Sequence, residues 1–373
     1  MAGHCDPRFR DVADAFAKNF RDGLELGAAC AIVVDGEIVV DLWEGLTRPG
    51  GEPWREDTLV ETRSATKGIA ALCMHMLNDR GLVDLDAPVR RYWPELRADP
   101  LIRHALAHSA GIPLIEQPLS PGALVDWDAM ARAVAAQEPL WEPGEKVGYH
   151  GVTFGWLIGE VVRRVTGTSI GTFVQHEIAR VVGGDYFIGT PPSQHHRIAP
   201  MFRSPVTKAS SPTPAAAEPP AESMSTRMMA PMYPPISPPW NSPEFWSAEI
   251  PVANGICTAR ALATIYGVLA QGGGPLVSSE SVASMGAAVY EGLDEVQEIP
   301  VRRTLGFELA PPWEDAGRPD TAFGHPGAGG FVAFADPAAG VGFAYVKNAG
   351  SPTPGQPDPR GPRLVRALYD SMR

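Results

Sequence analysis

The sequence predicts an α+β fold in which an antiparallel sheet is flanked by helices and a mostly helical region is inserted between its strands. Three observations predict it. Strand-like segments occur near both ends of the 373 residues, helical periodicity dominates the middle, and tight-turn signals join neighbouring strands. We therefore expect residues 1–88 and 251–373 to build one α/β region with a single sheet, and residues 89–250 to form the mostly helical region.

The N-terminal part begins with an expected hairpin over residues 29–43. Two apolar runs there are separated by Asp35-Gly36, a pair that accepts the positive φ angles of a tight turn. From Ser64 the apolar residues recur three and four positions apart, which predicts a buried helix that ends near Gly81.

Helical periodicity in the middle of the chain is clearest over residues 155–166. From about Pro200 to Pro243 the chain is rich in Pro, Ala and Ser, and no regular structure is expected there. The remaining expected elements are a helix over 259–271, strands at 304–309, 330–336 and 341–347, and a closing helix over 363–372.

Charge and composition exclude several classes of protein. The 31 Lys and Arg residues against 43 Asp and Glu residues leave a net charge of −12, which argues against nucleic-acid binding. No run of apolar residues approaches the roughly 20 needed to span a bilayer, and the N-terminus does not resemble a secretory signal. The four cysteines contain no Cys-x-x-Cys pair, so reduced thiols in the cytoplasm are expected. No feature predicts an oligomeric state.

A hydroxyl and an amine stand three residues apart in Ser64-Ala65-Thr66-Lys67. On a helix this spacing projects both side chains to the same side, where they can share a hydrogen bond. A serine hydroxyl is a weak nucleophile alone, but a neighbouring lysine whose pKa is lowered by burial can take its proton. Because Ser-x-x-Lys also arises by chance, a capping serine beside a solvated lysine is the structural alternative.

Two further segments strengthen the catalytic interpretation. Residues 141–144 (Trp-Glu-Pro-Gly) lead into 148–151 (Gly-Tyr-His-Gly), and residues 325–330 (His-Pro-Gly-Ala-Gly-Gly) run into an expected strand. With Ser-x-x-Lys at Ser64 and the segment 101–113, these motifs follow one another in an order that resembles the serine β-lactamase and penicillin-binding-protein superfamily. The likeness is greatest to its class C-like branch, which includes the family VIII carboxylesterases.

The resemblance implies a role for each matching residue. Ser64 is then the acylated nucleophile, Lys67 its hydrogen-bonded base, and Tyr149 the group that relays a proton to or from the leaving oxygen. A tyrosine with an ordinary pKa of about 10 acts as a base near neutrality only if a cation stabilises its phenolate, and Lys67 is the expected cation. The backbone amides of Ser64 and Ala328 are expected to form the oxyanion hole.

The resemblance also implies a substrate-binding set, His150, Gly151, His325 and Gly327, and the sequence departs from the family pattern at two of these positions. Gly151 stands where class C enzymes have the asparagine of Tyr-x-Asn, and His325 replaces the lysine of Lys-Thr-Gly. With an ordinary pKa near 6.5, His325 is a conditional cation, which weakens recognition of a carboxylate. We therefore expect a serine hydrolase that cleaves short-chain carboxylic esters without a cofactor.

Alternatives remain on the same fold and outside it. The fold also serves β-lactamases and D-amino-acid peptidases that act on amides, acyltransferases, and in principle a binding protein with an inactive site. Methionines in the later half of the Pro-rich stretch either line a substrate entrance or belong to a surface loop.

Two other motifs have structural interpretations. Gly167-Thr168-Ser169-Ile170-Gly171 matches the nucleophile elbow of α/β-hydrolases, but it follows a helical segment instead of a strand, so Ser169 is expected to cap the next helix. His104 and His108 have the spacing of zinc ligands on a helix, yet the glutamate of His-Glu-x-x-His is missing, and no metal site is predicted.

Overall fold

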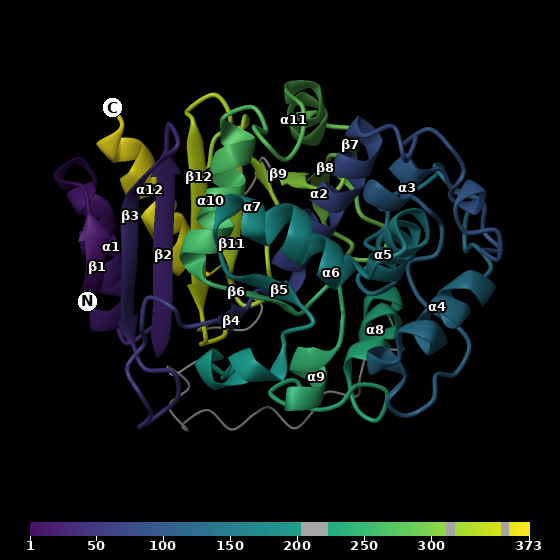
Figure 1. The fold of residues 1–373 in the computed structure, drawn as a ribbon, viewed down its shortest axis with the longest axis horizontal. Coiled ribbons are helices and arrows are strands. Elements are labelled where there is room, and N and C mark those ends of the chain that lie inside the picture. The colour runs from purple at the N-terminus through teal and green to yellow at the C-terminus, as the bar shows by residue number, and fades with distance from the viewer. Residues whose placement is uncertain (203–222, 311–317, 352–357) are drawn as a thin grey trace.

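The largest element of the structure is a nine-stranded antiparallel sheet built from both ends of the chain (Figure 1). The structure is a computed structural model that describes residues 1–202, 223–310, 318–351 and 358–373. The strands lie in the order β1 (Ala2–Cys5), β3 (Glu37–Gly45), β2 (Gly27–Val34), β12 (Val341–Lys347), β11 (Val332–Asp336), β10 (Phe323–Gly324), β9 (Glu308–Leu309), β8 (Pro300–Arg303) and β7 (Tyr290–Leu293). The expected α+β class and the single sheet from two termini are confirmed.

Pairing of β2 with β12 joins the two ends of the chain. Val34 lies opposite Val341 and Ala28 opposite Lys347, so seven residues of the C-terminal strand run along the N-terminal one. Every residue of both strands is buried because helices cover both faces of the sheet. The first helix α1 (Arg10–Arg21) and the last helix α12 (Arg360–Ser371) pack together on one face, while α10 (Ala259–Ala270) covers the other.

The helical part of the molecule lies on the side of α2 (Thr66–Asp79) away from the large sheet (Figure 1). It contains the helices α3 (Ile102–Leu106), α4 (Trp127–Ala136), α5 (Thr153–Thr166) and α6 (Ile170–Val174). A three-stranded sheet connects this part to the rest, since β5 (Tyr186–Ile188) pairs with β6 (Gly255–Cys257), which pairs with β4 (Val60–Glu61). The division near residues 88 and 251 stays a prediction, because one buried apolar cluster runs through both parts.

Most elements begin and end close to where the sequence places them. The hairpin turns at Asp35-Gly36, where both residues have positive φ, and the helix after Ser64 ends before Gly81, whose φ is +68°. None of the helices in the described part of the chain is long and apolar enough to cross a membrane.

Two expectations about regular structure are wrong. The strand expected at 304–309 is present only as β9 at 308–309. Residues 304–307 form a turn between β8 and β9, because Gly306 adopts a φ of +95° and the Thr304 amide donates to the Phe307 carbonyl. In the Pro-rich stretch, α8 (Met224–Met229) and α9 (Pro243–Ser247) form where Ser223 and Ser242 cap the first turns. The part of this stretch at 203–222 lies outside the described residues.

We predict that Gly342→Ala destabilises the fold by about 3 kcal/mol, because the added methyl group meets backbone atoms that cannot yield locally. A Cβ at this position of β12 would lie 2.2 Å from the Gly267 nitrogen and 2.5 Å from the Ala263 oxygen of α10. Urea unfolding followed by circular dichroism measures the effect. Gly286→Ala is the matched control, since its Cβ would meet only the Phe323 ring at 3.3 Å. Equal unfolding midpoints for the two variants would contradict the packing of α10 on β12.

Candidate active site

Ser64, the expected nucleophile, lies in a short turn of 3₁₀ helix, Arg63–Ala65, directly before α2. The three-residue spacing places the Lys67 amine in the first turn of α2, with Nζ 3.3 Å from Ser64 Oγ. The same amine donates to the carbonyl oxygen of Val252 at 3.1 Å, which fixes its direction. Ser64 and Lys67 therefore have the geometry of a nucleophile and its proton acceptor.

Burial determines the charge of Lys67. Its side chain is 1% exposed, and this desolvation holds the pKa of the amine well below its usual range, with the nearby Arg303 guanidinium adding to the effect. A neutral amine has a lone pair that can accept the Ser64 proton. The structural alternative of a solvated lysine is thus wrong for this site.

Tyr149 comes from the segment that precedes α5, and its ring centre lies 4.8 Å from Lys67 Nζ. Burial raises the pKa of Tyr149 to about 12, although a hydrogen bond with Ser64 and the charge of Arg303 act in the opposite direction. The resting tyrosine is therefore a phenol that donates a proton. Burial disfavours the charged form of Lys67 as well, so it opposes the positive charge that the expectation assigns to this amine, whose role beside a phenolate stays a prediction.

The turn at Gly327 packs against the backbone that leads into the nucleophile. A Cβ on Gly327 would lie 2.5 Å from the carbonyl oxygen of Thr62, so only glycine permits this approach. Ala328 follows in the turn, and both Ser64 and Ala328 line the same cavity. The turn is thus adjacent to the nucleophile, while the pairing of the Ser64 and Ala328 amides as an oxyanion hole stays a prediction.

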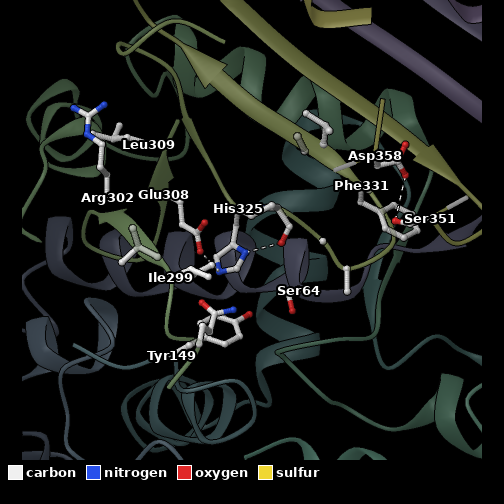
Figure 2. Close-up of a pocket in the computed structure, with 18 of the residues that line it drawn as sticks. Ser64, Tyr149, Ile299, Arg302, Glu308, Leu309, His325, Phe331, Ser351 and Asp358 are labelled. Carbon is white, nitrogen blue, oxygen red and sulfur yellow. Dashed lines mark hydrogen bonds and ion pairs between the residues drawn. The ribbon is translucent and has the colours of Figure 1, made fainter. Parts of the chain in front are cut away.

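His325 is a buried imidazole in an environment that disfavours its positive charge. It is 2% exposed, and its burial, with the charge on neighbouring groups, holds the pKa of the ring well below its usual range. Nδ1 lies 2.9 Å from the Pro326 carbonyl oxygen, so Nδ1 carries a proton, and Nε2 lies 3.9 Å from the Glu308 carboxylate. Figure 2 shows the ring of His325 close to Tyr149 and Glu308. His325 therefore provides no positive charge for a substrate carboxylate.

His150 and Gly151 do not contact the cavity in the way the family pattern implies. Both ring nitrogens of His150 bond to backbone groups, Nδ1 to the Gly148 oxygen at 2.6 Å and Nε2 to the Ile112 amide at 3.2 Å. The space beside Gly151 is filled by Met228, whose sulfur accepts the Gly151 amide at 3.0 Å. The asparagine of the family pattern is thus replaced by a methionine from α8.

The cavity has a volume of about 570 Å³ and a mixed lining. Figure 2 shows Ser64, Tyr149 and His325 near one another among the residues that line it. Apolar side chains from the β7–β9 edge of the sheet, from α8 and from the residue before β11 form much of its wall: Met228, Met229, Ile299, Val301, Leu309 and Phe331. Two methionines of the Pro-rich stretch therefore line the cavity, as one of the two interpretations expected.

Sequence reasoning missed Arg63, which precedes the nucleophile. Its φ is +54°, a conformation that costs a non-glycine residue on the order of 1 kcal/mol. Its guanidinium lies 3.6 Å from the Trp240 ring centre and 3.1 Å from the buried Glu61 carboxylate. These contacts hold the turn that contains Ser64. Glu61 is two residues from Arg63, but Trp240 lies far away in the sequence, so no local motif marks that contact.

Sequence reasoning also missed the buried charged groups beside Tyr149. Asp294 accepts the Tyr149 backbone amide at 3.0 Å, and Arg303 lies with its guanidinium carbon 5.2 Å from the Tyr149 ring centre. Glu308 pairs with Arg303 and lines the cavity. No local pattern marks these residues, because the elements that carry them meet Tyr149 only in the folded chain.

The rival motifs have the structural roles expected of them. Ser169 caps α6 by accepting the Thr172 amide, and its hydroxyl donates to Glu249 at 2.6 Å. Gly167, with a φ of +72°, ends the preceding helix. His108 is buried and accepts the His150 backbone amide at 3.0 Å, which uses one of its two ring nitrogens.

We predict that Gly151→Asn strongly lowers turnover, because its Cβ would lie 2.4 Å from the Met228 sulfur and would force the thioether into the cavity. The double variant Gly151→Asn/Met228→Ala should turn over the ester at least about tenfold faster than Gly151→Asn, because removal of the Met228 thioether frees the space that the asparagine needs. Ester turnover and thermal unfolding of the two single variants and the double variant measure the coupling. If the effects of the two substitutions on turnover were additive, the hypothesis that Met228 occupies the space of the family's asparagine would be wrong.

Comparison with known proteins agrees with this site. The sequence pattern of the family described as Beta-lactamase matches residues 16–367. The esterase/β-lactamase LipL of Mycobacterium tuberculosis is 34% identical over 359 residues, 93% of this chain and 82% of that protein. A family VIII carboxylesterase structure superposes with a TM-score of 0.87 at 38% identity, and a penicillin-binding-protein homologue from Caulobacter crescentus with 0.87 at 37%, each over 99% of both chains. The resemblance inferred from the motifs is confirmed, and the chain belongs to the β-lactamase family.

Proposed function

We propose that this protein is a serine ester hydrolase that acts through an acyl-enzyme on Ser64. The observation that carries the proposal is the neutral, buried Lys67 amine 3.3 Å from the Ser64 hydroxyl at the base of a cavity that also contains Tyr149. LipL and the carboxylesterase structure, both esterases by name, are similar over nearly the whole chain.

In acylation, Ser64 Oγ attacks the ester carbonyl carbon while its proton moves to Lys67 Nζ. The carbonyl oxygen becomes negative, and the amides of Ser64 and Ala328 are the donors we assign to it. When the bond to the alcohol oxygen breaks, Tyr149 gives its phenolic proton to that oxygen, and the Lys67 ammonium returns a proton to Tyr149. The high pKa of Tyr149 suits this donor role, because an alkoxide is a stronger base than a phenolate.

In deacylation, a water molecule attacks the acyl carbon and its proton passes through the same two groups to Ser64 Oγ. Each step is then balanced, and Ser64 and Lys67 end in their starting states. Lys67 carries the extra proton only within the cycle, which is consistent with its lowered pKa in the resting site.

The lining favours uncharged ester substrates over β-lactams. His325 is neutral, and Met228 fills the space next to Gly151, so the two groups expected to hold a carboxylate and an amide are absent from these positions. A short acyl chain suits apolar walls formed by side chains such as Ile299, Leu309 and Met229.

We also propose a cytoplasmic location. All four cysteines are free thiols, and Cys30, Cys73 and Cys257 are buried, an arrangement usual for proteins of reducing compartments. Fractionation of cells that carry the tagged chain tests this proposal, and recovery outside the cytoplasmic fraction would contradict it.

We predict that Ser64→Ala lowers ester turnover by at least about 10⁴-fold, whereas Ser169→Ala keeps most of it. Ser64 lines the cavity and has the Lys67 amine within hydrogen-bond distance. Ser169 caps a helix and donates to the Glu249 carboxylate, and the loss of this cap costs about 1 kcal/mol of stability. Labelling with a fluorescent phosphonate, followed by peptide mapping, identifies the reactive serine. Label on Ser169, or an inactive Ser169→Ala variant, would favour the nucleophile-elbow alternative.

We predict that kcat/KM for aryl acetate and butyrate exceeds that for a chromogenic cephalosporin by at least about 100-fold, since position 325 carries a histidine where the family pattern has a lysine. A substrate panel of aryl esters of increasing acyl length, an amino-acid amide and a cephalosporin measures the preference. Faster cleavage of the cephalosporin or the amide would replace the esterase proposal by an amide-directed one. Product analysis with added alcohol separates hydrolysis from acyl transfer.

A further inference from the structure

Two basic side chains contact the ring of Tyr149. Lys67 Nζ lies 4.8 Å from the ring centre, and the Arg303 guanidinium carbon lies 5.2 Å from it. Burial makes the Lys67 amine neutral in the resting site, whereas an arginine guanidinium keeps its proton in proteins. Arg303 is therefore the permanent positive charge beside the catalytic tyrosine.

Arg303 is held in one orientation at the end of β8. Its Nη2 donates to Asp294 at 3.1 Å and to Gln297 at 3.0 Å, and Nη1 pairs with Glu308. The Arg303 side chain is 1% exposed and that of Asp294 is fully buried, so neither charge is screened by solvent.

The Asp294 carboxylate binds both Arg303 and Tyr149. While Oδ2 accepts from the guanidinium, Oδ1 accepts the Tyr149 backbone amide at 3.0 Å and the amides of Val296 and Gln297. The distance between the tyrosine and the guanidinium is therefore set by one shared carboxylate. A buried ion pair needs only its two charged partners, whereas here Asp294 also binds the backbone of Tyr149.

We propose that Arg303 is a positioning residue whose fixed guanidinium supplies a permanent positive charge beside Tyr149 and Lys67, adds to the effect of burial on Lys67 and supports Tyr149 during proton transfer. The inference rests on the proposed function. It assigns the electrostatic role expected of Lys67 to a residue that needs no change of protonation to perform it.

The remaining titratable groups around Tyr149 and Lys67 do not supply this charge. The rings of His108 and His325 lie 4.9 and 6.2 Å from the Tyr149 ring, and burial holds the pKa of both well below its usual range. Asp294 and Glu308 are carboxylates. Without Arg303 they would favour the protonated forms of Lys67 and Tyr149.

The sign of the expected pH effect follows from the role of Lys67. The amine must lose its proton before it can accept the proton of Ser64, so reactivity rises with pH through the pKa of Lys67. Removal of the positive neighbour raises that pKa and moves the rise in reactivity to higher pH.

The experiment measures, as a function of pH, the rate constant for covalent inactivation of Ser64 by a p-nitrophenyl phosphonate. Arg303→Gln should move the midpoint up by about one pH unit or more, while Arg303→Lys, which keeps the cation, should stay near the wild-type midpoint. Ester kcat/KM should fall by about 100-fold or more in Arg303→Gln and less in Arg303→Lys. The midpoint does not depend on the fraction of molecules that fold.

Two further variants keep the test decisive. Arg260→Gln removes a partly exposed arginine of α10 that pairs with Asp41 of β3. The pH midpoint of this control variant should equal that of the wild type. Glu308→Gln removes a negative charge from Arg303 and should move the midpoint to lower pH, which decides the matter if Arg303→Gln yields no folded protein.

The outcomes separate this inference from the proposed function. An unshifted midpoint in Arg303→Gln, equal shifts in Arg303→Gln and Arg303→Lys, or an upward shift in Glu308→Gln would overturn the role of Arg303 while Ser64 remains the nucleophile. Failure of the wild-type protein to take up phosphonate at Ser64 would overturn the proposed function itself.

Discussion

Burial of the Lys67 amine is the constraint on which the active site depends. α2 starts immediately after the nucleophile and is buried along almost its whole length, so the amine three residues beyond Ser64 points into the protein interior. Desolvation makes it a base, but it also removes the charge that would stabilise a tyrosinate. The roles that we propose for Lys67, Tyr149 and Arg303 follow from these two opposite effects of burial on the amine.

The residues proposed to transfer protons match the family pattern, whereas two of the residues expected to bind the substrate do not. Ser64, Lys67 and Tyr149 keep the family arrangement, since acyl transfer requires it whatever group leaves. At the substrate side, Gly151 and His325 depart from the pattern, and each change has a local structural complement: Met228 occupies the space beside the glycine, and the Pro326 carbonyl holds the imidazole. The walls of such a cavity can change without disturbing its base.

The sequence predicts those parts of the molecule that local patterns determine. Periodicity and turn chemistry predicted the hairpin at Asp35-Gly36 and the helix that ends at Gly167, and the Ser-x-x-Lys spacing predicted the contact of Ser64 with Lys67. Asp294 and Tyr149 are 145 residues apart, so their contact has no local signal. The same limit applies to two local elements. In the 304–309 segment propensity favours a strand throughout, but the positive φ of Gly306 makes a turn. In the Pro-rich stretch propensity favours irregular structure, but Ser223 caps α8.

The central position of β12 has a consequence for how the chain is made. Translation delivers the β2–β3 hairpin early, and the edge of β2 that faces away from β3 has no partner until Val341–Lys347 emerges, about 300 residues later. During that interval an apolar strand edge is open to other nascent chains. The nucleophile turn is synthesised early, yet the turn at Gly327 that lies against it arrives with the last strands. Folding is therefore expected to be slow and largely post-translational, with the active site among the last features to form.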